Sequence, residues 1–246
     1  MRPTPRDGGG LRASAVADVG ERLRVLIVAG VSTGVLVVGF GSRLAMLVLR
    51  LTSPDRVRGV ESDDGFTIGE VTLAGTYNLL LLGAGVGIIG AAAYRLVAPW
   101  LIGPVWFRRV TTAAASGAVV GSMLVHADGI DFRLLQPTWL AIGLFIALPA
   151  AFGGLIGVAV DSVSSPDSRT ARGRVRWVLP VVLVACFPPV LFLVPFAVVL
   201  LFASFALRRE LPRTTPTGVT LAVRAVWLSI AVLGLVALVG DINDIV

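Results

Sequence analysis

Residues 25–51 read VLIVAGVSTGVLVVGFGSRLAMLVLRL, and this stretch decides the class of fold. It is apolar except for Arg43, Arg50 and a few small polar residues. As an α-helix it would be roughly 40 Å long at 1.5 Å per residue. About 20 apolar residues suffice to cross the ~30 Å hydrocarbon core of a bilayer. We therefore expect a membrane-spanning helix that tilts or protrudes.

The composition of the whole chain agrees with this interpretation. Of its 246 residues, 56% are hydrophobic and 15% charged, and the mean hydropathy is +0.89. A soluble domain carries nearer a quarter charged residues. All 21 basic residues are Arg, and they lie in short segments beside apolar stretches, where charge sets membrane orientation. We expect a polytopic helix bundle in the cell membrane, and we expect no nucleic-acid partner.

Several functional classes are excluded by residues that the chain lacks. Without Lys there is no Schiff-base lysine for retinal and no phosphate-loop lysine. A single cysteine, Cys186, excludes an internal disulfide and a cysteine metal cluster. No strong catalytic motif is present, so we predict no catalytic residues, no metal and no cofactor.

Further apolar stretches predict helices at about 77–97, 110–125, 138–160 and 219–239. The stretch 175–207 is too long for one span, and Pro188-Pro189 lies near its middle. Adjacent prolines remove two amide donors and clash with the preceding turn. The stretch is therefore either one kinked helix or two short helices joined by a tight turn.

The arginines favour two short helices, because only then do all basic loops face the cytoplasm. This predicts seven helices with the N-terminus inside and the C-terminus outside. The expected parts are a disordered basic cytoplasmic tail at 1–24, a bundle at 25–240 and a short acidic tail at 241–246. Outer loops are expected at 52–76 and 126–137, and in the first of them Phe66–Leu73 is predicted to form a small β-hairpin.

Glycines recur at four-residue spacing in the predicted helices, as in Gly30 with Gly34 and Gly83 with Gly87. This spacing places both glycines on one helix face and lets a neighbouring backbone approach closely. We expect these faces to pack within the chain rather than to form a dimer seam.

The most distinctive polar residues fall at the predicted outer side. Arg43 and Arg50 lie two turns apart on one helix face near the outer end of the helix. There they either reach lipid phosphates at the interface, or pair with Asp63, Asp64 or Asp131, or hold an anionic group. His126 is the sole histidine, and with nearby carboxylates it would offer nitrogen and oxygen ligands, although the same residues are ordinary in turns. The candidate outer site comprises Arg43, Arg50, Asp63, Asp64, His126, Asp128 and Asp131.

Three functions remain open from the sequence. The first is a non-catalytic assembly or lipid-facing module, with membrane lipids as partners and a membrane protein or another copy of the chain as further candidates. The second is a transporter or channel for a small anionic solute, for which a water-filled cavity reaching the midplane would be evidence. The third is an outer-leaflet enzyme, which requires His126, Asp128 and Asp131 to converge.

Overall fold

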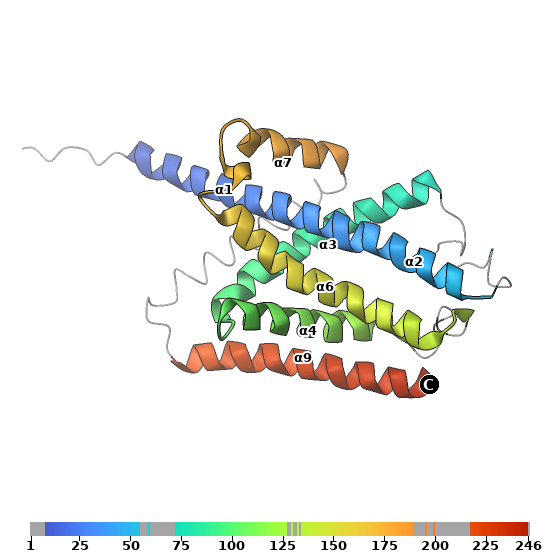
Figure 1. The fold of residues 1–246 in the computed structure, drawn as a ribbon. Helices are drawn as coiled ribbons and strands as arrows, with labels where there is room; N and C mark the ends of the chain where they lie inside the picture. Colours follow the sequence, from blue (N-terminus) through green and yellow to red (C-terminus); the bar gives the residue numbers. More distant parts are fainter. Residues whose placement is uncertain are drawn as a thin grey trace, which may run out of the picture.

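The computed structural model describes residues 8–54, 59, 72–126, 129, 132, 134–188, 195, 199 and 217–245. Within these ranges the regular structure is helical, and the helices lie side by side in a bundle (Figure 1). The α-helices are α1 (Gly8–Thr33), α2 (Gly41–Thr52), α3 (Leu73–Val97), α4 (Val105–Leu124), α6 (Thr138–Ser164), α7 (Val175–Cys186) and α9 (Thr217–Ile245). The π-helix η1 (Gly34–Phe40) joins α1 to α2, and η3 (Ala98–Trp100) and η4 (Arg169–Ala171) are short 3-10 helices.

Four of these helices are long and apolar enough to cross a membrane: residues 17–52, 73–100, 138–164 and 220–245. They coincide with four of the predicted spans. α4 is also long, with 20 residues, but Arg108 and Arg109 lie in its first two turns and it is not among the four. It packs on α6 along one side and on α9 along the other (Figure 1).

The predicted disordered tail is wrong for residues 8–24, which form the first turns of α1. Arg24 explains why the helix extends so far, because its side chain is only 1% exposed. It donates to the Glu21 carboxylate, to Thr170 Oγ1 at 2.9 Å and to the Val163 carbonyl at 2.9 Å. Arg176 forms a second ion pair with Glu21 at 3.0 Å. We call this set the Arg24 cluster, and it fastens α1 to α6, η4 and α7.

The predicted β-hairpin is wrong at its last residue. Leu73 begins α3, and the Thr72 side chain caps this helix by accepting a hydrogen bond from the Gly75 amide at 3.0 Å. An N-cap threonine satisfies one of the donors that a helix start leaves open, which favours helix over strand here. Residues 66–71 of the predicted hairpin lie outside the described residues.

α7 ends where the prolines require it to end. Its last residue is Cys186, and Phe187 leaves the helical conformation with φ −128° and ψ 69°. A residue before proline is disfavoured in the helical region, so the break follows from Pro188. The Tyr77 hydroxyl donates to the Cys186 carbonyl at 2.9 Å and ties this end of α7 to α3. Most of the stretch between Pro188 and α9 lies outside the described residues.

The first helix and α3 cross with their backbones in contact, because both carry glycine at the crossing. A Cβ atom on Gly30 would lie 2.8 Å from the Gly87 carbonyl oxygen, and one on Gly83 would lie 2.6 Å from that of Gly34. Such distances are too short for any side chain. The expected packing of these glycines within the chain is therefore confirmed.

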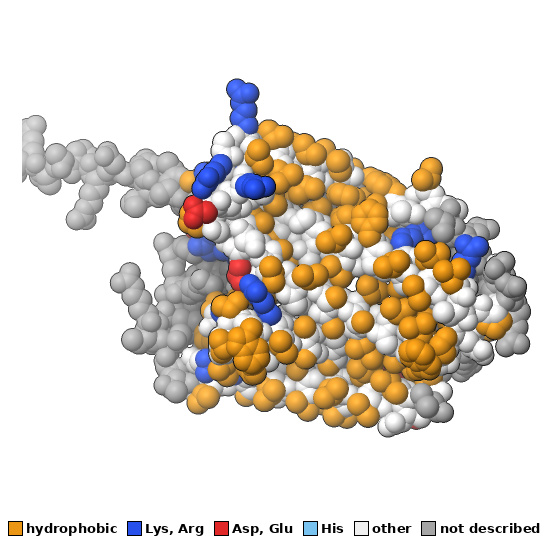
Figure 2. Space-filling model, viewed as in Figure 1, with side chains coloured by type: hydrophobic (Ala, Val, Ile, Leu, Met, Phe, Trp, Pro, Cys, Tyr) orange, Lys and Arg blue, Asp and Glu red, His pale blue; other side chains and the backbone are white. Residues whose placement is uncertain are grey.

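Charge divides the molecule into an apolar middle and two polar ends. Figure 2 shows hydrophobic side chains over the middle of the visible face and charged groups towards both ends. We name the ends after Arg24 and Arg50. Between Arg24 and Arg43 the chain has no charged residue, and this helical interval rises about 27 Å, close to the thickness of a hydrocarbon core.

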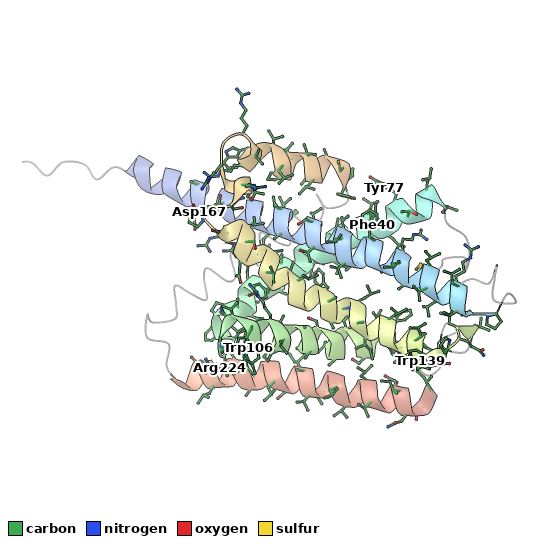
Figure 3. The ribbon with its side chains drawn as sticks, viewed as in Figure 1. Phe40, Tyr77, Trp106, Trp139, Asp167 and Arg224 are labelled. Atoms are coloured by element: carbon green, nitrogen blue, oxygen red, sulfur yellow. The ribbon has the colours of Figure 1, made fainter. Side chains whose placement is uncertain are left out.

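Tryptophans lie near both ends, as the aromatic belt of a membrane protein requires. Trp106 lies at the Arg24 end and Trp139 at the Arg50 end (Figure 3), and both are exposed. Near Trp106, Arg224 of α9 donates through Nε to the Trp100 carbonyl at 3.1 Å. α9 therefore starts at the Arg24 end.

Candidate functional site

The main feature of the described bundle is an apolar groove with a volume of about 650 Å³. Its walls come from α2, α3, α4 and α6, and Trp227 of α9 also lines it. We call it the bundle groove. Leu49 and Leu135 line it at the Arg50 end, and Leu101 lines it near the Arg24 end. The groove thus extends through most of the apolar middle of the molecule.

The groove arises because α3 and α4 both contact α6 but pack mainly towards opposite sides of it. α3 packs on α1 and η1, where the glycine crossing draws it close. α4 packs on α6 and α9, and small residues again permit the approach: a Cβ on Gly234 would lie 2.9 Å from the Cα of Val119. Because α3 and α4 pack mainly towards opposite sides, no described helix fills the space over α6 between them.

Large apolar side chains line this opening and remain exposed. On α3 they are Leu82, Val86 and Ile89, with Leu82 57% exposed. On α4 they are Val120 and Leu124. Side chains of this kind would be unfavourable at a boundary with water, so the opening is suited to the acyl chains of a bilayer.

Few polar side chains interrupt the apolar lining. Thr112 and Ser116 of α4 line its deeper part, but the Thr112 hydroxyl already donates to the Arg108 carbonyl at 2.6 Å. Tyr94 lies against Gly157, where a Cβ would come within 3.0 Å of its ring. These groups are too few to replace the hydration shell of an ion along the groove.

The charged side chains that line the bundle groove lie at its Arg50 end. Arg43 and Arg50 both belong to α2 and both line the groove, which confirms that they share one helix face. They are separated by two turns, or about 10.5 Å along the axis. No described residue forms an ion pair with Arg50. Two guanidinium groups beside an apolar groove can bind the anionic headgroup of an amphiphile.

The other members of the predicted site do not join this pair. His126 follows the cap residue Val125 at the end of α4, is exposed and does not line the groove. Asp63, Asp64, Asp128 and Asp131 lie outside the described residues, so their convergence with His126 stays a prediction. Within the described part of the chain, no three His, Cys, Asp or Glu side chains gather as metal ligands would.

Ser122 lies one helical turn before His126, but the geometry does not support a serine nucleophile there. The Ser122 hydroxyl donates to the Val119 carbonyl at 2.9 Å, as serines in helices commonly do. A nucleophile needs a base within hydrogen-bonding reach, and this hydroxyl bonds the helix backbone instead.

Sequence reasoning missed the groove itself, although two signals pointed towards it. Trp227 lies inside the predicted helix at 219–239 and not at its end, and it lines the groove. Arg43 and Arg50 share a face that continues as an apolar face, through Met46 and Leu47, into the same groove. Neither signal states that α3 and α4 diverge, because that depends on packing between distant segments.

Comparisons with known proteins return no match for this chain: it matches no protein-family model, and no curated protein and no solved structure is significantly similar to it.

Proposed function

We propose that this protein is a non-catalytic, lipid-handling membrane protein whose bundle groove binds an anionic amphiphile. The observation that carries the proposal is one continuous apolar groove with Arg43 and Arg50 at a single end. Its volume of about 650 Å³ falls within the range of roughly 300 to 1,000 Å³ typical of ligand pockets. In this arrangement the tail lies along α3 and α4, and the headgroup lies at the arginines.

The depth of the arginines supports this placement of the headgroup. Arg24 and Arg43 bound an uncharged interval about as long as a hydrocarbon core is thick. Arg43 would then lie at the edge of the core, and Arg50 would lie about 10.5 Å further out, at headgroup level. Lipid phosphates occupy this level, and arginine binds phosphate with two parallel hydrogen bonds.

Binding of paired probes with one chain and two headgroups tests the proposal. The full-length protein in an uncharged maltoside detergent is titrated with hexadecyl phosphate and with hexadecylphosphocholine, and native mass spectrometry counts the bound molecules. We expect preferential binding of the phosphate. The double variant Arg43→Gln, Arg50→Gln should weaken it at least about 100-fold, since each charge-assisted hydrogen bond contributes about 1.5–3 kcal/mol and the variant removes one at each arginine.

The matched control is Arg172→Gln, because Arg172 pairs with Asp167 on the exposed surface at the other end of the bundle. It changes the net charge without touching the groove. Equal binding of both headgroups, or equal losses in the control and the double variant, would refute the proposal.

Transport of a small anionic solute is the second candidate, and the depth of the groove is the observation in its favour. The groove reaches past the middle of α3, as a transport path must. Its apolar lining counts against a hydrated anion, because a charge at that depth costs several kcal/mol without polar partners. Uptake of a small anion such as formate into proteoliposomes, abolished by Arg43→Gln, would favour transport over lipid binding.

We further propose that the chain crosses the membrane seven times, with the N-terminus in the cytoplasm and the C-terminus outside. α9 runs in the same direction as α1 (Figure 1), and Arg224 bonds to Trp100 at the Arg24 end. The chain must therefore return to this end between Cys186 and Thr217, which supports a further span there. Basic side chains of several segments also gather at the Arg24 end, as a cytoplasmic side requires.

Single cysteines in a Cys186→Ser background test the topology in intact cells. The variants His126→Cys and Asn243→Cys should react with an impermeant thiol reagent. Pro166→Cys and Gly218→Cys should react only after permeabilisation. Labelling of Gly218→Cys in intact cells would contradict the proposed span between Cys186 and Thr217, and the chain would then cross the membrane fewer than seven times.

A further inference from the structure

Two hydroxyl groups lie in the deeper part of the bundle groove, away from its arginines. Tyr94 comes from the last turns of α3 and Ser116 from the middle of α4, and both line the groove. A Cβ on Gly157 of α6 would lie 3.0 Å from the Tyr94 hydroxyl oxygen. One on Gly153, a single turn away, would lie 2.6 Å from the Ser116 Cβ. The two glycines are about 6 Å apart along α6, so the two hydroxyls lie close together over this helix.

Both hydroxyls are free to bind a ligand. Among the residues that the structure describes, none forms a hydrogen bond with either of them. The charges of Asp161, Arg108 and Arg109 act on Tyr94 without such a bond. Tyr94 is nevertheless only 8% exposed, and a buried tyrosine hydroxyl normally finds a partner because an unpaired one costs free energy. A hydrogen-bond acceptor carried by a ligand of the groove would complete both groups.

The level of the two hydroxyls in the membrane indicates which acceptor this is. The charged residue Asp161 follows Gly157 by one turn of α6, so Tyr94 lies about 6 Å inside that charge at the Arg24 end. This level is the edge of the hydrocarbon core, where the ester groups of phospholipids join the acyl chains to the headgroup. A tyrosine or serine hydroxyl can donate to the carbonyl oxygen of such an ester.

The ester carbonyl belongs to a lipid of the leaflet at the Arg24 end. A Cβ on Gly39 would lie 3.3 Å from the Leu80 Cα, and Arg43 lies four residues further towards the other end. From Leu80 to Tyr94, α3 rises about 21 Å. The phosphate and the ester carbonyls of a phospholipid are only a few bonds apart. A lipid with its phosphate at Arg43 or Arg50 therefore cannot place an ester carbonyl at Tyr94.

We propose that Tyr94 and Ser116 form a second lipid subsite of the bundle groove, which binds an ester carbonyl of a phospholipid from the leaflet at the Arg24 end. The acyl chains of this lipid enter sideways between α3 and α4, where Val86 and Ile89 are exposed in the groove. The inference goes beyond the function proposed above, because this subsite does not depend on the arginines at the other end.

Two lipids that differ only in the linkage of their chains test the subsite. Dipalmitoyl phosphatidylcholine has two ester carbonyls, whereas its dihexadecyl ether analogue has none, and the shared headgroup keeps any contribution of the arginines equal. Each is titrated onto the lipid-free, full-length protein in maltoside detergent, and native mass spectrometry counts the bound molecules. The unmodified protein should bind the ester lipid at least about fivefold more tightly, the lower limit for two hydrogen bonds.

Tyr94→Phe and Ser116→Ala remove the hydroxyls and keep the packing, because each retains the atoms that contact α6 apart from the oxygen. Each should weaken binding of the ester lipid about twofold to tenfold and leave binding of the ether lipid unchanged. The double variant should bind both lipids equally. Tyr77→Phe is the matched control, since it makes the same chemical change at a tyrosine that does not line the groove and bonds to Cys186 instead.

Three outcomes would overturn the inference. The unmodified protein could bind the ester and ether lipids equally, or the double variant could keep the same ester preference as Tyr77→Phe. The ester preference could also disappear in the double variant Arg43→Gln, Arg50→Gln, which would assign the carbonyl to a lipid held at the arginines. The function proposed above fails through a different result, because the two hexadecyl probes that test it carry no carbonyl group.

Discussion

Gly34→Ala should be one of the most destabilising small substitutions in this chain, although it adds a single methyl group. Gly34 begins η1 and lies against Gly83 and Gly87 of α3. A Cβ at this position would lie 2.8 Å from the Cα of Gly87 and still closer to the Gly83 carbonyl oxygen. Both neighbours are backbone atoms, so no side chain can rotate out of the way.

The size of the effect follows from how far the helices must separate. Carbon atoms in contact lie about 3.5–4.0 Å apart, so the crossing must open by about 1 Å, which forfeits a quarter to a half of each dispersion contact there. Overpacking of this kind lowers the free energy of unfolding by about 1–3 kcal/mol. We expect a loss at the upper end of this range because the added Cβ would clash with the backbone of two residues, Gly83 and Gly87. At about 2–4 °C per kcal/mol, the thermal midpoint should fall by roughly 6–12 °C.

The assay is thermal unfolding of the full-length protein in maltoside detergent, read as the fraction that remains monodisperse in size-exclusion chromatography after heating. The control is Gly143→Ala in α6, because a Cβ there meets no atom within 4 Å. Alanine is the better helix former by up to about 1 kcal/mol, so this control should be neutral or stabilising. If Gly34→Ala proved as stable as Gly143→Ala, the backbone crossing of the first helix and α3 would be refuted.

Two further predictions concern the ends of the bundle. Arg24→Leu should lower the free energy of unfolding by about 3–5 kcal/mol, because it removes the hydrogen bonds of a buried guanidinium to Glu21, Thr170 and Val163. Arg172→Gln should change the free energy of unfolding by less than about 1 kcal/mol, since its ion pair is exposed. Thermal unfolding compares the two variants, and equal effects would argue against the Arg24 cluster as a stabilising contact. Tyr77→Phe should lower the free energy of unfolding by about 1 kcal/mol, because it deletes the hydroxyl that donates to the Cys186 carbonyl. It should also speed amide hydrogen exchange in the last turn of α7. Unchanged exchange there would show that this hydrogen bond does not hold the end of α7 in place.

The sequence by itself determined the class of the fold and the position of most helices. Long apolar stretches must satisfy their backbone polar groups internally in a membrane, and a helix does so locally, so the pattern is legible without tertiary information. The packing role of Gly30, Gly34, Gly83 and Gly87 was legible for the same local reason, since their spacing places each pair on one face. The break at Pro188 followed from the chemistry of proline.

Other features depended on partners distant in the chain. Residues 8–24 looked unstructured because they are polar and Gly-rich, yet they are helical and Arg24 is buried against Thr170 and Val163. No local sequence pattern predicts such a contact between segments almost 150 residues apart in sequence. Leu73 likewise fits the alternating pattern of a strand in the sequence, but in the structure it is the first residue of α3, which Thr72 caps.

The candidate site shows the same division. Its charge was visible in the sequence, since Arg43 and Arg50 are conspicuous within an apolar stretch and helical geometry places them on one face. Its apolar part was not, because the bundle groove exists only where α3 is drawn to the first helix while α4 is held by α6 and α9. Local sequence specifies what each helix can bury, but the space between helices is set by which neighbours they pack against, and only the tertiary structure decides that.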